Sequence, residues 1–376
     1  MKIGVLKETK PFETRVALTP DLVKQITKKG FEVIIENEAG VSSSFSDDNY
    51  INAGANIGSR KDVCQSDVIL KVNALTVEEI GFCKDGIVCI SFLYAYTIPE
   101  VVEALKAKKI SSFSMDAVPR ISIAQKMDAL SSQANLAGYK TVILGANALG
   151  RIFPLLMTAA GTITPVKVLI FGAGVAGLQA VATAKRLGAV VEVTDVRPET
   201  KEQVESLGGK FLTVEGVEGV KIEGGYAKEV SAEFLQKQKE LVEAKIKEAD
   251  LVITTALVIG KKAPVLVSEE MVKSMKTGSV IVDMAVESGG NCAVSEINKT
   301  VVKHGVTIIG ESNLPALLPI NASQLYATNI STLFYHLTDE NGFKWNMEDE
   351  ITKGSLITHN GELVNSFTKS ILEKSK

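Results

Sequence analysis

The stretch FGAGVAG at residues 171–177 decides the fold predicted for this chain. The apolar run VKVLIF (166–171) comes directly before it and predicts a buried strand, whereas residues 174–187 predict a helix. Three glycines therefore stand in the turn between a strand and a helix. A second predicted strand, AVVEVTD (189–195), follows the helix, so the stretch is the centre of a strand–helix–strand unit in a parallel sheet.

The spacing Gly-x-Gly-x-x-Gly in this context predicts a dinucleotide-binding site, with a role in packing alone as the alternative. Gly172 permits the tight turn, Gly174 lets the backbone approach a pyrophosphate, and Gly177 allows the helix to pack closely on the strand. The helix N-terminus adds free N–H groups and a partial positive charge, which favour phosphate. Asp195 ends the next strand about 20 residues on, where a carboxylate accepts from ribose hydroxyls and repels a 2′-phosphate. The sequence thus favours NAD over NADP, although Arg197 is able to pair with a 2′-phosphate.

Strand and helix patterns alternate along the rest of the chain. The predicted strands are residues 2–5, 31–35, 67–70, 86–91, 110–113, 166–171, 189–195, 249–256, 278–285 and 305–310. One helix is expected after Thr19 as N-cap, and another at residues 97–109, where Thr97 and Glu100 are spaced as a capping box. This alternation predicts an α/β fold with two doubly wound parallel-sheet (Rossmann-like) domains separated by a cleft.

The 376 residues are too many for one ordinary core, which favours two domains. We predict an N-terminal α/β domain at residues 1–131, completed by residues 318–376, and an NAD-binding Rossmann domain at residues 132–317. The sequence is irregular after Gly310 and helical from about Ser323. The last stretch has too little apolar sequence for a core of its own, so it is expected to return to the first domain.

Composition excludes several classes of protein. A net charge of -3 without a basic cluster argues against nucleic-acid binding. The chain opens without a signal peptide. Residues 152–184 are nearly uncharged, but Lys167, two prolines and the glycine turn argue against a transmembrane segment, and a buried helix followed by a buried strand is expected. The cysteines show no CxxC pairing and predict buried thiols of a reducing compartment, with no metal site: Cys64, Cys83, Cys89 and Cys292.

Four further stretches border the predicted site. TTALVIG (254–260) and DMAVESGGNC (283–292) each follow a strand, at the edge where such sheets bind ligands. PRISIAQKMDALSS (119–132) offers the donors and acceptors that a carboxamide needs, although Arg120 and Asp128 alone would also explain it as a structural pair. EGGYAKEVS (223–231) has two glycines before a tyrosine, which fits either a lid or a plain surface loop.

Taken together, these stretches resemble one known family. The chain is similar nearly end to end to the NAD(H)-binding component (domain I, or alpha subunit) of proton-translocating nicotinamide nucleotide transhydrogenase. The resemblance rests on the stretches KETKPFETRVALTPDLVKQITKKGFEV, PRISIAQKMDALSSQANLAGYK, FGAGVAGLQAVATAKRLGA, TKEQVESLGGKF, GGYAKE, APVLVSEEMVKSMKTGSVIVDMAVESGGNC and SQLYATN. The alanine dehydrogenases are wider relatives that share the two-domain plan.

The resemblance implies a role for each matching residue. Arg120, Gln125, Asp128 and Ser131 would lie on a loop against the nicotinamide, with Gln125 reaching toward the second nucleotide, and Tyr226 would be the tyrosine of a mobile loop. The residues implied to bind the NAD(H) are Ser132, Gly172, Gly174, Val175, Ala176, Gly177, Asp195, Val196, Arg197, Gly225, Thr255, Ala256 and Leu257.

The resemblance also implies a reaction and partners. Hydride would pass directly between NAD(H) on this chain and NADP(H) on a separate partner domain, coupled by a membrane subunit to proton translocation. Because no substrate proton moves at such a site, a chain with only three histidines is sufficient. A homodimer is implied, located in the cytoplasm on the inner face of the cell membrane, or on the matrix side for an organellar protein.

Two other functions are weighed against this one. An alanine-type NAD-dependent amino-acid dehydrogenase would need a histidine near residues 89–97, where this chain has Phe92 and Tyr94, although Arg15 and Lys71 resemble that family's substrate contacts. A non-catalytic NAD-sensing module is the third alternative. An assay with pyruvate and ammonia separates the first two functions.

Overall fold

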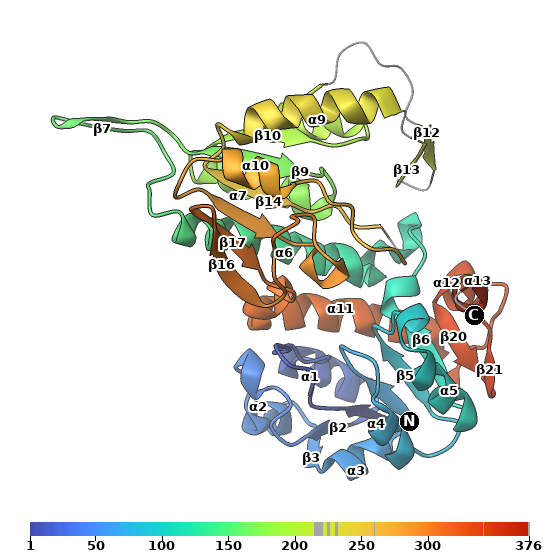
Figure 1. Ribbon diagram of the computed structural model, residues 1–376. Coiled ribbons are helices and arrows are strands. Elements are labelled where there is room, and N and C mark those ends of the chain that lie inside the picture. The colour runs from blue at the N-terminus through green and yellow to red at the C-terminus, as the bar shows by residue number, and fades with distance from the viewer. Residues whose placement is uncertain (214–220, 224–225, 230–231, 259, 341, 375–376) are drawn as a thin grey trace. The chain divides into compact units, whose positions relative to one another are not determined.

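The computed structural model describes residues 1–213, 221–223, 226–229, 232–258, 260–340 and 342–374. The chain divides into two compact units, each built on one large sheet (Figure 1). Unit 1 consists of Met1–Gln133 with Pro315–Lys376, and unit 2 of Ala134–Leu314. The sequence placed these boundaries after residues 131 and 317.

The sheet of unit 1 has the strand order β3-β2-β1-β4-β5-β6-β20-β21. Its first six strands are parallel, in the doubly wound order 3-2-1-4-5-6, and β20 and β21 add an antiparallel edge. The strands are β1 (Lys2–Val5), β2 (Glu32–Glu36), β3 (Asn56–Gly58), β4 (Val68–Leu70), β5 (Val88–Ser91), β6 (Ser111–Ser114), β20 (Leu356–His359) and β21 (Glu362–Leu363).

Helices pack on both faces of this sheet. Successive side chains of a strand point to opposite faces, so Val33 and Ile35 belong to one hydrophobic core and Ile34 to the other. The first core is completed by α1 (Pro20–Lys28), α2 (Asp47–Asn52) and α11 (Pro319–Leu337), and the second by α3 (Arg60–Cys64), α4 (Val77–Phe82) and α5 (Pro99–Ala107). Burial of both faces explains why the strands are continuous apolar runs in the sequence.

The sheet of unit 2 has the order β11-β10-β9-β14-β15-β17-β16. Its first six strands are again parallel, and β16 pairs antiparallel with β17. The strands are β9 (Lys167–Phe171), β10 (Val190–Thr194), β11 (Lys210–Phe211), β14 (Leu251–Thr254), β15 (Val280–Asp283), β16 (Lys299–Lys303) and β17 (Val306–Gly310). The predicted α/β fold with two doubly wound sheets is confirmed, and each sheet carries an antiparallel addition that was not predicted.

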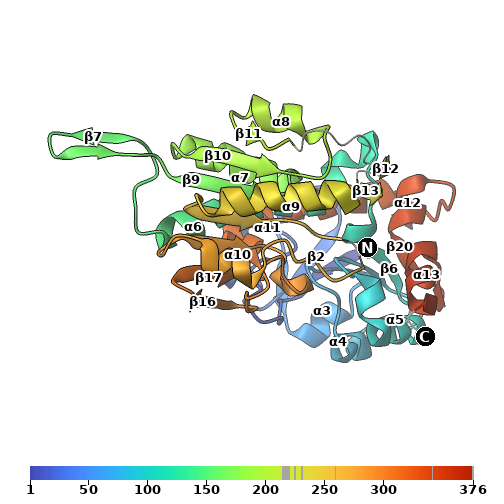
Figure 2. The same ribbon diagram turned by 45° about the horizontal axis from the view of Figure 1, so that its top comes forward.

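Two helical layers cover the sheet of unit 2 as well (Figure 2). One core contains Val168 and Ile170 of β9 and the other contains Leu169. The first is completed by α6 (Ala129–Ala148), α7 (Val175–Arg186) and α8 (Thr200–Ser206), and the second by α9 (Ala232–Ile246) and α10 (Glu269–Ser274). The chain passes from unit 1 to unit 2 within α6.

The C-terminal residues complete unit 1. Helix α11 begins at Pro319, earlier than the start predicted near Ser323, because a proline at the first helical position has no N–H that needs a partner. The remaining elements are β18 (Thr338–Asp339), β19 (Gly342–Phe343), α12 (Glu350–Ser355) and α13 (Ser366–Lys374).

The capping box predicted at Thr97 and Glu100 is wrong. Helix α5 begins at Pro99 with Ile98 as N-cap, and the Thr97 hydroxyl donates to the carbonyl oxygen of Tyr94 at 2.8 Å. The residue before a proline is disfavoured in the helical region, so the helix cannot begin before Pro99.

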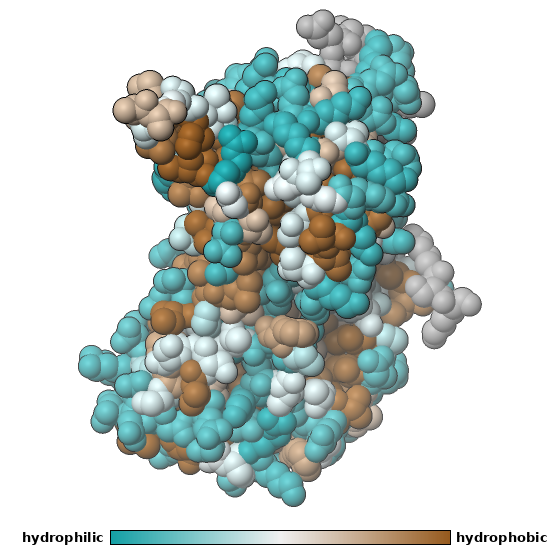
Figure 3. Space-filling model, turned by 60° about the vertical axis from the view of Figure 1, so that its left-hand side comes forward, coloured by the Kyte–Doolittle hydropathy of each residue, from teal (hydrophilic) through white to brown (hydrophobic). Residues whose placement is uncertain are grey.

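The buried helix expected at the start of residues 152–184 is wrong as well. Strands β7 (Leu156–Thr158) and β8 (Gly161–Ile163) form an exposed antiparallel hairpin that projects from unit 2. Pro154 and Pro165 flank the hairpin and Gly161 has a φ of +135°, which a helix cannot accommodate. Figure 3 shows hydrophobic side chains exposed on the side of the molecule from which this hairpin projects. Among the residues described, no helix combines the length and apolar character needed to cross a bilayer.

Candidate functional site

The glycine turn of unit 2 follows β9, at the point where the strand order reverses between β9 and β14. Gly172 has a φ of +99°, a conformation that side chains with a Cβ rarely adopt. A Cβ at Gly177 would collide with the carbonyl oxygen of Gly172, so the packing of α7 on β9 requires glycine there. At Gly174 a Cβ would meet only Arg197 Nη2, at 4.0 Å, which leaves room for a phosphate.

The N-terminus of α7 supplies the donors for this turn. Gly174 is its N-cap and has no side chain to occupy the first-turn N–H groups. Val175 is exposed, and Ala176 packs against α6, where a Cβ at Gly138 would collide with the Ala176 carbonyl oxygen. The geometry fits a pyrophosphate bound by backbone N–H groups at a helix N-terminus.

Asp195 follows β10 and is bonded to the same turn. Its Oδ2 accepts from the backbone N–H of Ala173 at 2.7 Å and from Arg197 Nη2 at 2.9 Å. Its Oδ1 accepts from the Arg197 backbone N–H at 2.8 Å and from Arg197 Nε at 3.0 Å. Burial alone would raise the pKa of Asp195, but the hydrogen bonds from Arg197 and Ala173 outweigh it and hold the pKa below its ordinary value.

The position of Arg197 changes the argument for NAD. Because its guanidinium neutralises Asp195, the repulsion of a 2′-phosphate by that carboxylate is weaker than the sequence indicated. Val196, between the two, is half-buried. A ribose that bound Asp195 would compete with Arg197 for the carboxylate oxygens.

Thr255, Ala256 and Leu257 follow β14 and border the glycine turn. Thr255 Oγ1 donates to the Phe171 carbonyl oxygen at 2.9 Å, and a Cβ at Gly172 would collide with this hydroxyl. Leu257 is 52% exposed. The glycine turn, Asp195 with Arg197, and this segment therefore lie together at the carboxyl edge of the sheet of unit 2.

Two residues that the sequence analysis left without a role hold this edge in place. Asn291 Oδ1 accepts from the Ala256 backbone N–H at 3.0 Å, and its Nδ2 donates to the carbonyl oxygens of Ala256 and Pro264 at 2.9 and 2.8 Å. Asp283, fully buried, accepts from the backbone N–H groups of Asn291 and Cys292 at 3.1 and 3.0 Å. A polar pair after a strand and a double glycine was the available signal in the sequence.

The double glycine of this segment serves the turn. Gly289 and Gly290 have φ values of +99° and +80°. A Cβ at Gly290 would lie 2.8 Å from Asp283 Oδ2 and 2.6 Å from Ser295 Oγ. A tight turn around a buried carboxylate accounts for both glycines.

The polar segment predicted to contact a nicotinamide lies in unit 1. It forms a 3-10 turn, η4 (Ser122–Met127), and the first turn of α6. Asp128 accepts from the backbone N–H of Ser131 at 2.8 Å and from its Oγ at 2.6 Å, which is the geometry of an N-cap for α6. Gln125 and Arg120 are exposed, and Ser132 is half-buried.

The predicted lid is only partly described. Tyr226 begins β13 (Tyr226–Glu229), which pairs antiparallel with β12 (Lys221–Glu223). Gly225 and the side chain of Tyr226 lie outside the described residues.

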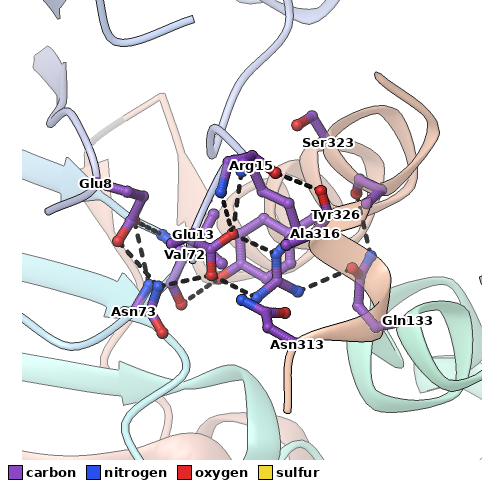
Figure 4. Close-up of polar contacts among 12 residues, drawn as sticks. Glu8, Glu13, Arg15, Val72, Asn73, Gln133, Asn313, Ala316, Ser323 and Tyr326 are labelled. Carbon is purple, nitrogen blue, oxygen red and sulfur yellow. Dashed lines mark hydrogen bonds and ion pairs between the residues drawn. The ribbon is translucent and has the colours of Figure 1, made fainter. Parts of the chain in front are cut away.

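The switch point of unit 1, between β1 and β4, carries a polar network instead of a glycine turn (Figure 4). Glu13 binds Arg15 through two hydrogen bonds, Oε1 to Nε at 2.8 Å and Oε2 to Nη2 at 2.7 Å. Asn73 Nδ2 donates to Glu13 Oε2 at 3.0 Å and to Glu8 Oε2 at 2.9 Å. Arg15 Nη1 donates to Gln133 Oε1 at 2.9 Å.

The two glutamates of this network have opposite shifts. Burial opposes the ionisation of Glu13, but the hydrogen bonds and charge of Arg15 dominate and lower its pKa to about 2. Burial raises the pKa of Glu8 above its ordinary value, against the attraction of Lys71. Lys71 itself is buried and lies 2.8 Å from Glu79 Oε2. The cations of this switch point are therefore bound by carboxylates of the chain.

None of the three histidines of the chain lies on the carboxyl edge of a sheet. His304 stands at the amino end of β17 and bonds Glu269 at 2.8 Å, and His359 stands beside Ser111 at the amino end of β6, at 2.9 Å. His336 is in the last turn of α11 and bonds Asp349 at 2.9 Å.

Comparison with known proteins agrees with this architecture. Residues 4–137 match the family Alanine dehydrogenase/PNT, N-terminal domain, and residues 141–366 match Alanine dehydrogenase/PNT, C-terminal domain. The chain is 52% identical over 375 residues to the first of the parts that form the NAD(P) transhydrogenase subunit alpha of Rhodospirillum rubrum, and the match covers 97% of this chain and 98% of that protein. It is 31% identical over 373 residues to the alanine dehydrogenase of Bacillus subtilis, covering 96% of this chain and 92% of that protein.

A solved structure gives the same result. The transhydrogenase from Sinorhizobium meliloti is 41% identical, with a TM-score of 0.86 over 98% of this chain and 100% of that chain. The resemblance to the transhydrogenase component, identified from the motifs, is confirmed. The chain belongs to the alanine dehydrogenase/PNT family.

Proposed function

We propose that this chain is the NAD(H)-binding subunit of a proton-translocating transhydrogenase. The nicotinamide nucleotide would supply the hydride, which passes directly to or from NADP(H) held on a separate partner domain. A membrane partner would couple that transfer to proton translocation. The names of the transhydrogenase relatives support the assignment.

One observation carries the proposal: a complete dinucleotide turn without a histidine at either carboxyl edge. Direct hydride transfer between two nicotinamides moves no substrate proton, so it requires orientation and not a general base. His304, His336 and His359 are bonded elsewhere in the fold, and Lys71 is paired with Glu79.

In this proposal each segment of the site has a role. The N–H groups of Val175 and Ala176 would bind the pyrophosphate and Asp195 the adenosine ribose. Arg120, Asp128, Ser131 and Ser132 would hold the nicotinamide, and Gln125 would reach toward the second nucleotide. Tyr226 would close over the bound NAD(H), with Gly225 in its hinge.

The alanine-type dehydrogenase is less favoured. Phe92 occupies the stretch where that activity needs a histidine; it is 6% exposed and stacks on Tyr94, with ring centroids 5.8 Å apart. Arg15 and Lys71, which resemble substrate contacts of that family, are bound by Glu13 and Glu79. A carboxylate substrate would have to displace those glutamates.

Reconstitution tests the proposal. Hydride transfer from NADH to an NADP⁺ analogue is measured for the purified chain, with and without a purified NADP(H)-binding domain of this family. We expect transfer only with the partner domain. No transfer with the partner, together with NADH oxidation by pyruvate and ammonia, would contradict the proposal and favour the dehydrogenase.

We also propose a homodimer at the inner face of the cell membrane, bound there by the membrane partner. The exposed hairpin supports the dimer, because Leu155, Met157 and Ile163 are 53%, 73% and 42% exposed and form an apolar surface. Light scattering of the purified chain should give twice its 40.2 kDa mass. Met157→Lys should shift the mass toward the monomer, and a monomeric wild-type chain would refute the proposed dimer.

A further inference from the structure

The stretch SQLYATN (323–329) lies in α11 and places three polar side chains on one face of that helix. Ser323, Tyr326 and Asn329 follow each other at intervals of three residues, which brings them to the same side. All three are buried, with Asn329 the most exposed at 7%. Buried polar groups on one face require partners, and each of the three has its partner in a different loop of unit 1.

The first two residues bind loops at the carboxyl ends of β1 and β4. Ser323 Oγ accepts from the backbone N–H of Val16 at 3.0 Å. The Tyr326 hydroxyl donates to the carbonyl oxygen of Lys71 at 2.8 Å. Both loops belong to the polar network of Figure 4, so these contacts belong to the scaffold of unit 1.

Asn329 binds the segment that follows β6. Its Oδ1 accepts from Ser132 Oγ at 2.6 Å, and its Nδ2 donates to the carbonyl oxygen of Lys126 at 2.8 Å. Lys126 lies in η4 and Ser132 in the first turn of α6, so one amide joins the two sides of Asp128. Directional hydrogen bonds at both ends fix the orientation of the turn as well as its position.

Apolar contacts alone would not fix that orientation. Ala124 and Met127 of η4 are buried in the core that contains α11, whereas Gln125 between them is exposed. Apolar contacts are not directional, so they allow small rotations of a turn that would move an exposed side chain. The amide of Asn329 is the directional contact of this turn with α11.

We propose that Asn329 is a positioning residue for hydride transfer: it orients the turn that presents Gln125 and the first turn of α6 that presents Ser131 and Ser132. The inference rests on the proposed function, which places these residues at the nicotinamide. Asn329 acts through them and does not touch the nucleotide.

The test uses Asn329→Asp in the full chain. The variant retains an acceptor for Ser132 and loses the donor to Lys126. Hydrogen exchange of the amides at residues 122–128, measured on the chain alone, should become about tenfold faster. Single-turnover hydride transfer with the partner domain should slow about tenfold, while the Kd for NADH changes less than about twofold.

Tyr326→Phe is the matched control, because it removes a buried hydrogen bond from the same face of the same helix. It should lower the melting temperature and leave both the exchange at residues 122–128 and the transfer rate unchanged. If Asn329→Asp does not fold, Ser132→Ala removes one of the two bonds and should speed exchange about threefold.

Two results would overturn the inference: exchange that is unchanged in Asn329→Asp, or equal effects on transfer in Asn329→Asp and Tyr326→Phe. A wild-type chain that transfers no hydride with the partner would refute the proposed function instead. The exchange measurement would then still decide whether Asn329 orders the turn.

Discussion

Unit 1 and unit 2 share the order 3-2-1-4-5-6 for their six parallel strands, and in both the order reverses between the first and the fourth strand. The segment after the first strand differs. In unit 2 it is a short turn with Gly172 and Gly174, and α7 begins with free N–H groups. In unit 1 it runs from Leu6 to Thr19 without a glycine, and α1 begins with Pro20, which has no N–H to offer.

The difference shows that strand order provides a position for a site and the first turn decides what fills it. Backbone donors and open space at Gly174 suit an external anion. In unit 1 the same position is filled by the chain's own carboxylates, of which Glu13 binds Arg15 and Glu79 binds Lys71. One switch point is therefore built to bind a ligand, and the other stabilises its own unit.

The largest expected effect comes from breaking the network of unit 1. Arg15→Met removes the partner of Glu13, whose side chain is fully buried, and should lower the free energy of unfolding by about 3–5 kcal/mol. Lys7→Met is the control, because the Lys7–Glu38 pair is exposed and should contribute less than about 1 kcal/mol. Denaturant unfolding followed by circular dichroism measures both. Equal, small losses would mean that the network does not stabilise unit 1.

The same pair predicts a dependence of stability on pH. The pKa of Glu13 is lowered from 4.5 to about 2 in the folded chain, so its contribution is complete above pH 4.5 and is lost as the pH falls toward 2. That loss should be on the order of 3 kcal/mol in the wild type and much smaller in Glu13→Gln. Parallel stability curves for the two proteins between pH 5 and 2 would contradict the assignment.

The glycine turn of unit 2 should give the next largest effect. In Gly177→Ala the new Cβ collides with the Gly172 carbonyl oxygen, so α7 must move away from β9. We expect the affinity for NADH to fall about 100-fold. Gly81→Ala in α4 is the control, because no atom lies within 4 Å of its new Cβ. Calorimetric titration with NADH distinguishes the two variants, and equal affinities would exclude the turn as the phosphate site.

Asp195→Ala should weaken NADH binding about tenfold. The substitution leaves Arg197 without its carboxylate partner, so the guanidinium becomes available to a 2′-phosphate. The preference for NADH over NADPH should narrow accordingly. Unchanged selectivity in competitive binding measurements would remove Asp195 from the ribose site.

Arg197→Ala should have the smallest effect. It frees two acceptor positions on Asp195 and removes the cation that reduces repulsion of a 2′-phosphate. NADH affinity should change by less than about threefold, and discrimination against NADPH should increase by a similar factor. Weaker discrimination in the same binding assay would show that Arg197 does not favour the phosphate.

The sequence by itself determined the two sheets, the dinucleotide turn and the family. These features depend on local patterns: apolar runs mark buried strands, and the spacing of Gly172, Gly174 and Gly177 reports a turn whose geometry only glycine allows. The ends of elements were predicted less well. Local rules conflict there, as at α5, where Pro99 set the start of the helix and the spacing of Thr97 and Glu100 did not.

Only the tertiary structure decided which polar residues are paired. Arg197 with Asp195, Lys71 with Glu79, and Asn329 with Lys126 and Ser132 are contacts between side chains and segments whose pairing no local pattern encodes. The exposed hairpin of β7 and β8 also came from the tertiary structure, because an apolar composition does not state whether a segment is buried. Pattern within a segment is fixed by covalent geometry and burial, whereas partners across segments are fixed only when the chain packs.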